Sequence, residues 1–413
     1  MPSTVSTQWL LDCLKQPQCA EADLPSTLHA VLDWAAIVQL ADQHGVTPLL
    51  YARLQQRPSL WSSVPAAVQT HCQQRYLDSA YRNLQLYQHG LTLLKALRQA
   101  GLAVIVLKGV YLAYTVYGDR ALRPMADVDI LVKHADVPAV EAVLQASGYT
   151  LSDWKHRTWC LRNHYHLSYW NPITAITIEV HWHIQRPTAP YPINVDVLWQ
   201  QAQPVTMVGV QTQALSHEHL VLHHSLHIAK HGFAVGLRPF CDLAIILAQF
   251  GQQINWSQVQ AEAQRWRINK ALYLALYFTH EFLGAGSAEL LATLKPALLD
   301  PAILITAREQ ILTLGSGGNR LSTDFLQLWE NESGQNKLMQ LVRRLFLPPD
   351  LMSSIYGMAP DSWLVYLYYP VRLVDLLLRY PALTRRLLRR DAATLTLAQR
   401  TTKVDTLREW LAT

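Results

Sequence analysis

Charged residues and cysteines are both scarce in this sequence. Only 16% of its 413 residues are charged, and the net charge of +5 is too small to argue by itself for a nucleic-acid partner. The cysteines are odd in number, scattered and without a Cys-x-x-Cys pair, which argues against a disulfide scaffold and gives no reason to expect a zinc site among them. They are Cys13, Cys19, Cys72, Cys160 and Cys241. We therefore expect reduced thiols and a cytoplasmic protein.

Long uncharged apolar runs are also missing. The nearest candidate for a membrane-spanning helix, residues 363–378, is interrupted by Pro370, Arg372 and Asp375, so no transmembrane segment is expected. The N-terminus lacks the basic start and the apolar core of a signal peptide. With 413 residues, the chain is long enough for two or three domains. Half of the residues are apolar, which is enough for a sizeable core.

The most informative motif is a pair of acids in an otherwise apolar run, Asp127-Val128-Asp129-Ile130-Leu131-Val132. Side chains two residues apart on a strand project from the same face. Two carboxylates placed so close repel each other and resist burial unless a cation lies between them. The motif therefore predicts a divalent metal and metal-assisted phosphoryl or nucleotidyl transfer. The alternative is a solvated turn at the edge of a strand.

The surrounding pattern alternates strands and helices. Residues 103–107 are expected to form a buried strand that ends at Lys108-Gly109, and residues 110–116 a short helix. The alternation in 176–183 predicts a strand with Glu179, His181 and His183 on one face. Further elements are expected as strands 128–132, 164–169 and 205–210 and helix 136–146, with 164–169 antiparallel to 176–183. Three carboxylates on neighbouring strands can bind two divalent metals, which clamp a triphosphate.

These motifs resemble the bacterial nucleotidyltransferase family proteins of the DNA polymerase β-like superfamily, in the branch with a Lys-Gly turn. The resemblance covers residues 28–265. The matching segments are Leu107-Lys108-Gly109, Tyr117-Gly118-Asp119, Arg123-Pro124-Met125, the Asp-x-Asp strand, Gly148-Tyr149 and the Glu-x-His-Trp run Glu179-Val180-His181-Trp182. It implies an α+β fold with a mixed sheet and flanking helices, between N- and C-terminal helical regions.

The resemblance implies that Asp127 and Asp129 are paired metal ligands and catalytic residues, and that Glu179 is the third carboxylate. It also implies that Gly109 lets the backbone approach the phosphates. Better-known members of the superfamily have Gly-Ser at this turn, whereas this chain has Lys108-Gly109. Lys108 would then replace a hydroxyl contact to the triphosphate with a charge.

Arg123 and several histidines have two interpretations each. Arg123 would contact phosphate or acceptor, or would pair with Asp119 or Asp127. His181 would line the cleft or be a satisfied strand histidine. The resemblance extends to His227, His231 and Asp242 as residues lining the same cleft, without assigning them a chemical role.

A helix is expected to start at Ser216, a good N-cap, and to carry six histidines. His223, His227 and His231 recur every four residues and share one face. They are either metal ligands or neutral imidazoles packed against the neighbouring domain. No glutamate stands between them in the metalloprotease arrangement, which disfavours that class.

Four regions are expected: helical 1–99, the nucleotidyltransferase core 100–210, a helical domain 211–314 with the histidine-rich helix, and helical 315–413. The last region ends in a basic tail, with arginines from Arg379 to Arg400 and Lys403. An amphipathic basic helix there would contact an acidic membrane or RNA, or would be a solvated surface.

The sequence thus predicts an enzyme that binds a nucleoside triphosphate such as ATP with Mg²⁺ or Mn²⁺. It would transfer a nucleoside monophosphate to an acceptor hydroxyl and release pyrophosphate. The acceptor would be a small molecule, an RNA such as tRNA, or a protein, as for toxin-like relatives. The alternative is a catalytically silent nucleotide-binding or scaffold protein. The motifs specify neither the base, nor the acceptor, nor the oligomeric state.

Overall fold

The computed structural model describes residues 4–15, 32–152, 157–313, 347, 349–356, 363–379 and 406–412. The chain divides into two compact units. The first comprises residues 1–152 and 165–316, and the second comprises residues 153–164 and 317–411. All candidate site residues belong to the first unit.

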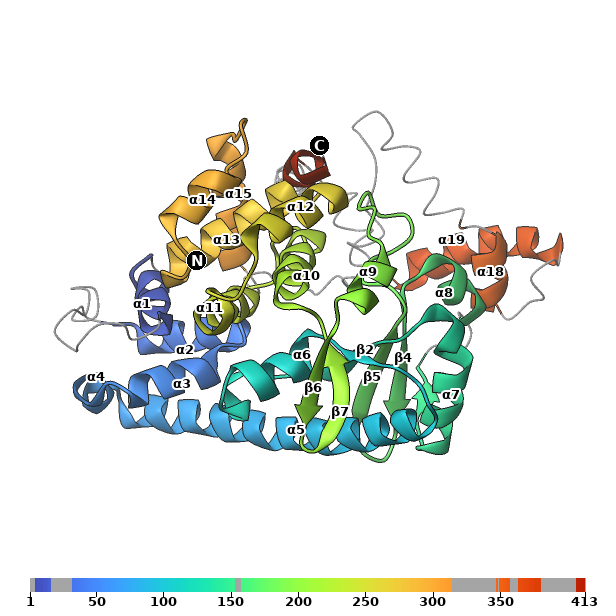
Figure 1. Cartoon of the computed structure of the whole chain (residues 1–413), viewed down its shortest axis with the longest axis horizontal. Helices are drawn as coiled ribbons and strands as arrows, with labels where there is room; N and C mark the ends of the chain where they lie inside the picture. Colours follow the sequence, from blue (N-terminus) through green and yellow to red (C-terminus); the bar gives the residue numbers. More distant parts are fainter. Residues whose placement is uncertain are drawn as a thin grey trace. The chain divides into compact units, whose positions relative to one another are not determined.

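Helices account for most of the first unit (Figure 1). The N-terminal helices are α1 (Thr4–Leu14), α2 (Trp34–Gln43), α3 (Thr47–Gln55), α4 (Pro58–Ser63) and α5 (Ala66–Gln99). The helices between the strands are α6 (Lys108–Tyr111), η3 (Leu112–Val116), η4 (Arg120–Leu122), η5 (His134–Asp136), α7 (Val137–Ala146) and α9 (Val195–Gln200). After the last strand follow α10 (His217–Lys230), α11 (Arg238–Phe250), α12 (Trp256–Trp266), α13 (Asn269–Leu283), α14 (Ala288–Leu294) and α15 (Pro301–Leu312).

A seven-stranded mixed sheet forms the centre of this unit, with strand order β3-β4-β5-β2-β1-β7-β6. The strands are β1 (Ile105–Val106), β2 (Asp127–Leu131), β3 (Thr150–Leu151), β4 (His166–Asn171), β5 (Ile176–His181), β6 (Gln203–Met207) and β7 (Val210–Ala214). β2 pairs parallel with β5 and antiparallel with β1, and β4 pairs antiparallel with β5 as expected. The prediction of an α+β fold with a mixed sheet flanked by helices is confirmed.

The expected single strand at 205–210 is wrong, because the chain forms a hairpin of β6 and β7 there. Val208 and Gly209 make the turn with φ of 47° and 77°. Two-residue hairpin turns of this kind require positive φ at both positions, where a β-branched residue is rare. Because Val208 is β-branched, the sequence gives no sign of a turn at this position.

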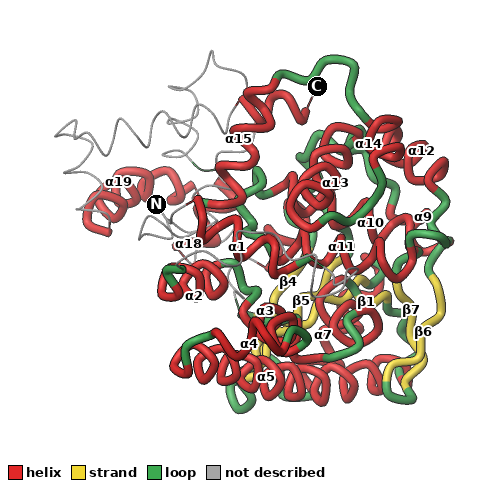
Figure 2. Tube along the Cα trace, turned by 90° about the vertical axis from the view of Figure 1, so that its left-hand side faces the viewer, coloured by secondary structure: helices red, strands yellow, loops and turns green. Residues whose placement is uncertain are grey.

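The two faces of β2 carry opposite chemistry. Val128 and Ile130 are fully buried on the face toward α5, where a Cβ on Gly90 would stand 3.6 Å from the Val128 side chain. The alternation of a strand puts Asp127 and Asp129 on the other face. In Figures 1 and 2, α5 lies along one side of the sheet, and α10 to α14 gather on the other side.

α10 begins as the sequence predicts, since the Ser216 side chain accepts a hydrogen bond from the backbone N–H of His219. Most of its side chains are buried, so it lies inside the unit rather than on its surface. Burial on all sides explains why its pattern shows no clear apolar stripe.

The second unit contains α8 (Arg157–Asn163), α18 (Pro349–Tyr356), η7 (Trp363–Leu367) and α19 (Tyr368–Arg379), with a small core of Leu347, Met352 and Val365. Among the described residues, no helix combines the length and apolarity needed to cross a membrane. The basic residues from Arg385 to Lys403 lie outside the described residues.

Candidate active site

The register of two parallel strands places the acidic residues together. Asp129 of β2 is the register partner of Glu179 of β5, and Asp127 is the partner of Thr177. Register partners project from the same face of a sheet, so the carboxylates of Asp129 and Glu179 are neighbours. Asp129 is buried, whereas Asp127 and Glu179 are partly exposed.

His181 lies between two of these carboxylates. Its Nε2 is 3.1 Å from Oδ1 of Asp129 and 3.3 Å from Oε2 of Glu179. Burial alone would lower the pKa of His181, but the hydrogen bonds to both carboxylates raise it above its ordinary value. The imidazole therefore contacts Asp129 and Glu179 through the same nitrogen, Nε2. His183 does not join them, because β5 ends at His181 and the His183 ring contacts the backbone of Ile193 and Gln185 instead.

Lys108 reaches the same face from the start of α6. Its Nζ is 3.8 Å from Oδ2 of Asp129 and donates to Nδ1 of His227 on α10 at 3.4 Å. The pKa of His227 is held well below its usual range, first by burial and then by the charge of Lys108. His227 is therefore neutral and can accept this hydrogen bond. The backbone N–H of Leu107 donates to the Asp129 carbonyl at 3.0 Å, which fixes the turn beside β2.

The two aspartates have opposite electrostatic surroundings. Burial would raise the pKa of Asp129, but Lys108 and His181 hold it far below its ordinary value. The pKa of Asp127 is raised to about 6 by burial and by the charges of Asp129 and Glu179, which Lys108 and Arg238 offset only in part. The site thus carries an excess of negative charge at Asp127. Carboxylate oxygens are the ligands that Mg²⁺ takes, so Asp127, Asp129 and Glu179 are suitable donors by type. Among the described residues, however, the group of three whose ligand atoms lie within 4.8 Å of one another is His166, Glu179 and His181.

Asp127→Asn is expected to stabilise the protein in the absence of divalent metal at pH 7.5 and to stabilise it less at pH 4.5, with no effect below the unfolded pKa of 3.8. A carboxyl whose pKa rises on folding, here from 3.8 to about 6, binds its proton more tightly in the folded state. Its stabilising contribution is therefore lost as the pH rises through about 6. The check is the midpoint of thermal unfolding in EDTA across this pH range, where we expect a gain of a few degrees. A variant that melts below the wild type at pH 7.5 would contradict this electrostatic description.

Arg123 and Asp242 form a buried ion pair. Nε and Nη2 of Arg123 each donate to a carboxylate oxygen of Asp242 at 2.9 Å, and the Tyr117 hydroxyl donates to the same carboxylate at 2.7 Å. Arg123 therefore pairs with neither Asp119 nor Asp127. Burial opposes both charges, yet each partner favours the charged form of the other, so the pKa of Asp242 is lowered and that of Arg123 is raised. A Cβ on Gly109 would stand 3.5 Å from Nη1 of Arg123, so the ion pair packs against the Lys108-Gly109 turn.

The histidines of α10 are packed rather than clustered around a ligand. Burial is the main cause that holds the pKa of His223 and His227 well below the ordinary value and lowers that of His224 to about 4. The His227 ring packs edge-on against His231, with 4.8 Å between ring centroids. Within the described ranges, no group of three close metal-ligating side chains includes them. These observations support neutral imidazoles in a packed helix.

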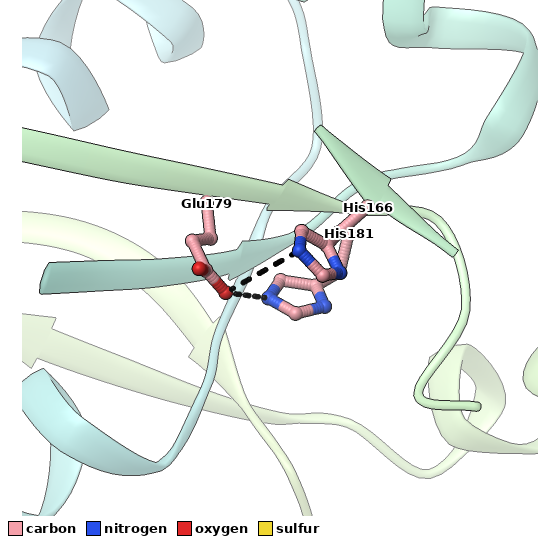
Figure 3. A group of neighbouring side chains, drawn as sticks. All are labelled: His166, Glu179 and His181. Carbon is pink, nitrogen blue, oxygen red and sulfur yellow. Dashed lines mark ion pairs between the residues drawn. The ribbon is translucent and has the colours of Figure 1, made fainter. Parts of the chain in front are cut away.

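Sequence reasoning missed a histidine beside Glu179. His166 of β4 is the register partner of His181, and its Nε2 is 3.9 Å from Oε2 of Glu179 (Figure 3). The Ser168 hydroxyl donates to Oε1 of Glu179 at 3.5 Å. The period-two pattern of 164–169 indicated a strand beside 176–183, but only the register of the pair shows which histidine faces His181.

Comparison with known proteins identifies a family. The model of a family described as "Uncharacterised nucleotidyltransferase" matches residues 31–284, which is more than half of the chain and includes every candidate site residue. No curated protein and no solved structure matches.

Proposed function

The chain belongs to this family of uncharacterised nucleotidyltransferases, and on that premise we propose that it transfers a nucleoside monophosphate from a nucleoside triphosphate to an acceptor hydroxyl. Mg²⁺ or Mn²⁺ would be held by Asp127, Asp129 and Glu179. The observation that carries the proposal is the register of β2 and β5, which sets Asp129 beside Glu179. Beside these two carboxylates, the pKa of Asp127 is raised to about 6. Negative charge that the protein itself does not neutralise is what a cation site requires.

The divalent metal would supply charge neutralisation for the phosphates and a lowered pKa for the attacking hydroxyl. The chain's own residues supply position. Lys108 faces the acids with its ammonium held by neutral His227, so it can also meet an anionic phosphate oxygen. In the absence of metal, Nε2 of His181 is hydrogen-bonded to Oδ1 of Asp129 and lies 3.3 Å from Oε2 of Glu179, so His181 links the two side chains.

In the proposed step the acceptor oxygen forms a bond to the α-phosphorus, and the bond from this phosphorus to the bridging oxygen breaks in line. Pyrophosphate leaves with the electron pair. The hydroxyl proton goes to a carboxylate, for which Glu179 is the more accessible group, with 26% of its side chain exposed against 8% for Asp129. Fixed charges placed where the transition state needs them account for most of such catalysis.

The test is label transfer. Each α-labelled triphosphate is incubated with Mg²⁺ or Mn²⁺ and with cell extract separated into RNA, protein and small-molecule fractions. We expect label in one fraction, and no transfer by the Asp127→Ala/Asp129→Ala variant. The labelled fraction identifies the acceptor class. Absence of transfer, together with absence of metal-dependent triphosphate binding, would overturn the proposal and favour a scaffold protein.

Gly109→Ala is expected to raise the KM for the triphosphate about 10-fold or more without lowering stability. A Cβ at Gly109 meets only ordinary contacts, 3.5 Å from Arg123 and 3.7 Å from Met125, and Gly109 lies within α6. Alanine in a helix is more favourable than glycine by roughly 0.5–1 kcal/mol. The fold therefore does not require glycine here, whereas a close approach of phosphate to the backbone does. Loss of one hydrogen bond to a charged phosphate costs about 1.4 kcal/mol or more, which corresponds to about a tenfold weaker affinity.

Steady-state kinetics and thermal unfolding of the same Gly109→Ala preparation separate the two effects. Gly118→Ala offers a contrast, because Gly118 has a φ of +74° and so the substitution strains the backbone. It should lower stability. An unchanged KM for Gly109→Ala would show that the turn does not approach the triphosphate.

A further inference from the structure

A second set of potential metal ligands lies beside the three acids, and it contains nitrogen. His166, Glu179 and His181 each offer one ligand atom, and these atoms lie within 4.8 Å of one another (Figure 3). They are brought together by sheet geometry alone. Glu179 and His181 are two residues apart on β5, and His166 is opposite His181 on antiparallel β4.

The spacing of the three donors suits a single ion. Zinc binds histidine nitrogen and carboxylate oxygen at about 2.1 Å, so two ligands of a tetrahedral site lie roughly 3.4 Å apart. Oε2 of Glu179 is 3.3 Å from Nε2 of His181 and 3.9 Å from Nε2 of His166. An ion bound through Nε2 of His181 would replace the hydrogen bond between this nitrogen and Oδ1 of Asp129, which are 3.1 Å apart.

The ligand types select the class of ion. Mg²⁺ takes oxygen ligands, whereas imidazole suits Zn²⁺ and the neighbouring transition metals. Two histidines and one glutamate, with a coordination position left for water or substrate, are an established ligand set for zinc. The absence of a Cys-x-x-Cys pair does not bear on this site, since no thiolate belongs to it.

We propose that His166, Glu179 and His181 form a site for a zinc-class transition-metal ion, separate from the magnesium ligands Asp127 and Asp129 and joined to them through Glu179. Since Glu179 also serves the proposed function, the two sites share one ligand. The proposal does not depend on nucleotidyl transfer, because metal binding without nucleotide tests it. An ion bound here would draw Glu179 toward the histidines and so change how the site responds to Mg²⁺.

The experiment is metal titration of the full-length protein after removal of divalent ions by EDTA. Zn²⁺ binding is followed by calorimetry and Co²⁺ binding by visible absorption, for the wild type and for His166→Phe. Phenylalanine keeps the ring, which packs 4.6 Å from Tyr165 and 4.9 Å from His181, and removes the nitrogen ligand. We expect one equivalent of binding to weaken by at least about 10-fold, the lower bound for losing even an outer partner of a metal site.

His134→Phe is the matched control, because His134 is exposed and outside the cluster. It should bind Zn²⁺ as the wild type does, and millimolar Mg²⁺ should not displace the ion from either protein. Equal Zn²⁺ stoichiometry and affinity in the wild type and His166→Phe would overturn the proposal, as would complete displacement by Mg²⁺. If His166→Phe does not fold, His166→Gln provides the same comparison. If His166→Phe loses the zinc binding of the wild type and the wild type shows no label transfer, the zinc site is retained and the proposed function is rejected.

Discussion

Asp129→Asn is expected to lower nucleotidyl transfer by about 1000-fold. A bound metal contributes several kcal/mol of charge stabilisation to phosphoryl transfer, and about 4 kcal/mol corresponds to this factor. Asparagine keeps the shape of Asp129 but removes the charge that faces Lys108 and His181. The measurement is the rate of label transfer from an α-labelled triphosphate, together with the shift in unfolding temperature that Mg²⁺ produces in each protein.

The two aspartates should also differ in the sign of their effect on stability. The pKa of Asp129 is depressed, so its charge stabilises the folded state at neutral pH, and this contribution is lost as the pH falls through the folded pKa. Without metal at pH 7.5, Asp129→Asn should therefore melt below the wild type, whereas Asp127→Asn should melt above it. Asp196→Asn, at an exposed position of α9, should change neither turnover nor melting. An Asp129→Asn variant with wild-type turnover and an intact Mg²⁺ shift would refute the assignment of Asp129 as a metal ligand.

The part of the site that sequence could predict is the part set by local periodicity. Asp127 and Asp129 share a face because strand side chains alternate, and Glu179 and His181 share a face for the same reason. The N-cap at Ser216 is likewise a local signal, and the structure has it. Each of these predictions depends on residues within four positions of one another.

The remaining contacts depend on register and on long-range packing. The pairing of Asp129 with Glu179, and of His166 with His181, is fixed by which residues face each other across two strands. Arg123 has nearby acids in the sequence at Asp119 and Asp127, yet its partner is Asp242, 119 positions away. A short-range search for ion pairs therefore finds the wrong partner.

Burial was the second quantity that the sequence could not supply. The recurrence of His223, His227 and His231 is compatible with ligands on an exposed face or with a packed face. The structure buries most of α10, which lowers the pKa of His223 and His227 and keeps both imidazoles neutral. A neutral His227 can accept from Lys108, which links the histidine-rich helix to the acids of β2.

Asp242→Asn is expected to lower the free energy of unfolding by about 3–5 kcal/mol, the usual cost of leaving one partner of a buried ion pair without its counter-charge. The side chain of Asp242 is only 2% exposed and that of Arg123 only 8%. The measurement is urea-induced unfolding followed by far-UV circular dichroism. Glu281→Gln is the control, because its pair with Arg308 is exposed to solvent and should contribute only about 0–1 kcal/mol.

A double variant separates a structural role of this pair from a role in the cleft. Arg123→Met/Asp242→Leu removes both charges, and replacing a buried ion pair by apolar side chains is often neutral or stabilising, so it should be more stable than Asp242→Leu alone. Arg123 also lies under the Lys108-Gly109 turn, so the double variant should recover stability more fully than affinity for the triphosphate. If Asp242→Asn instead kept full stability and raised only the KM, Asp242 would line the cleft, as the family resemblance suggests. A large loss of stability would place Asp242 among the residues that hold the turn in position.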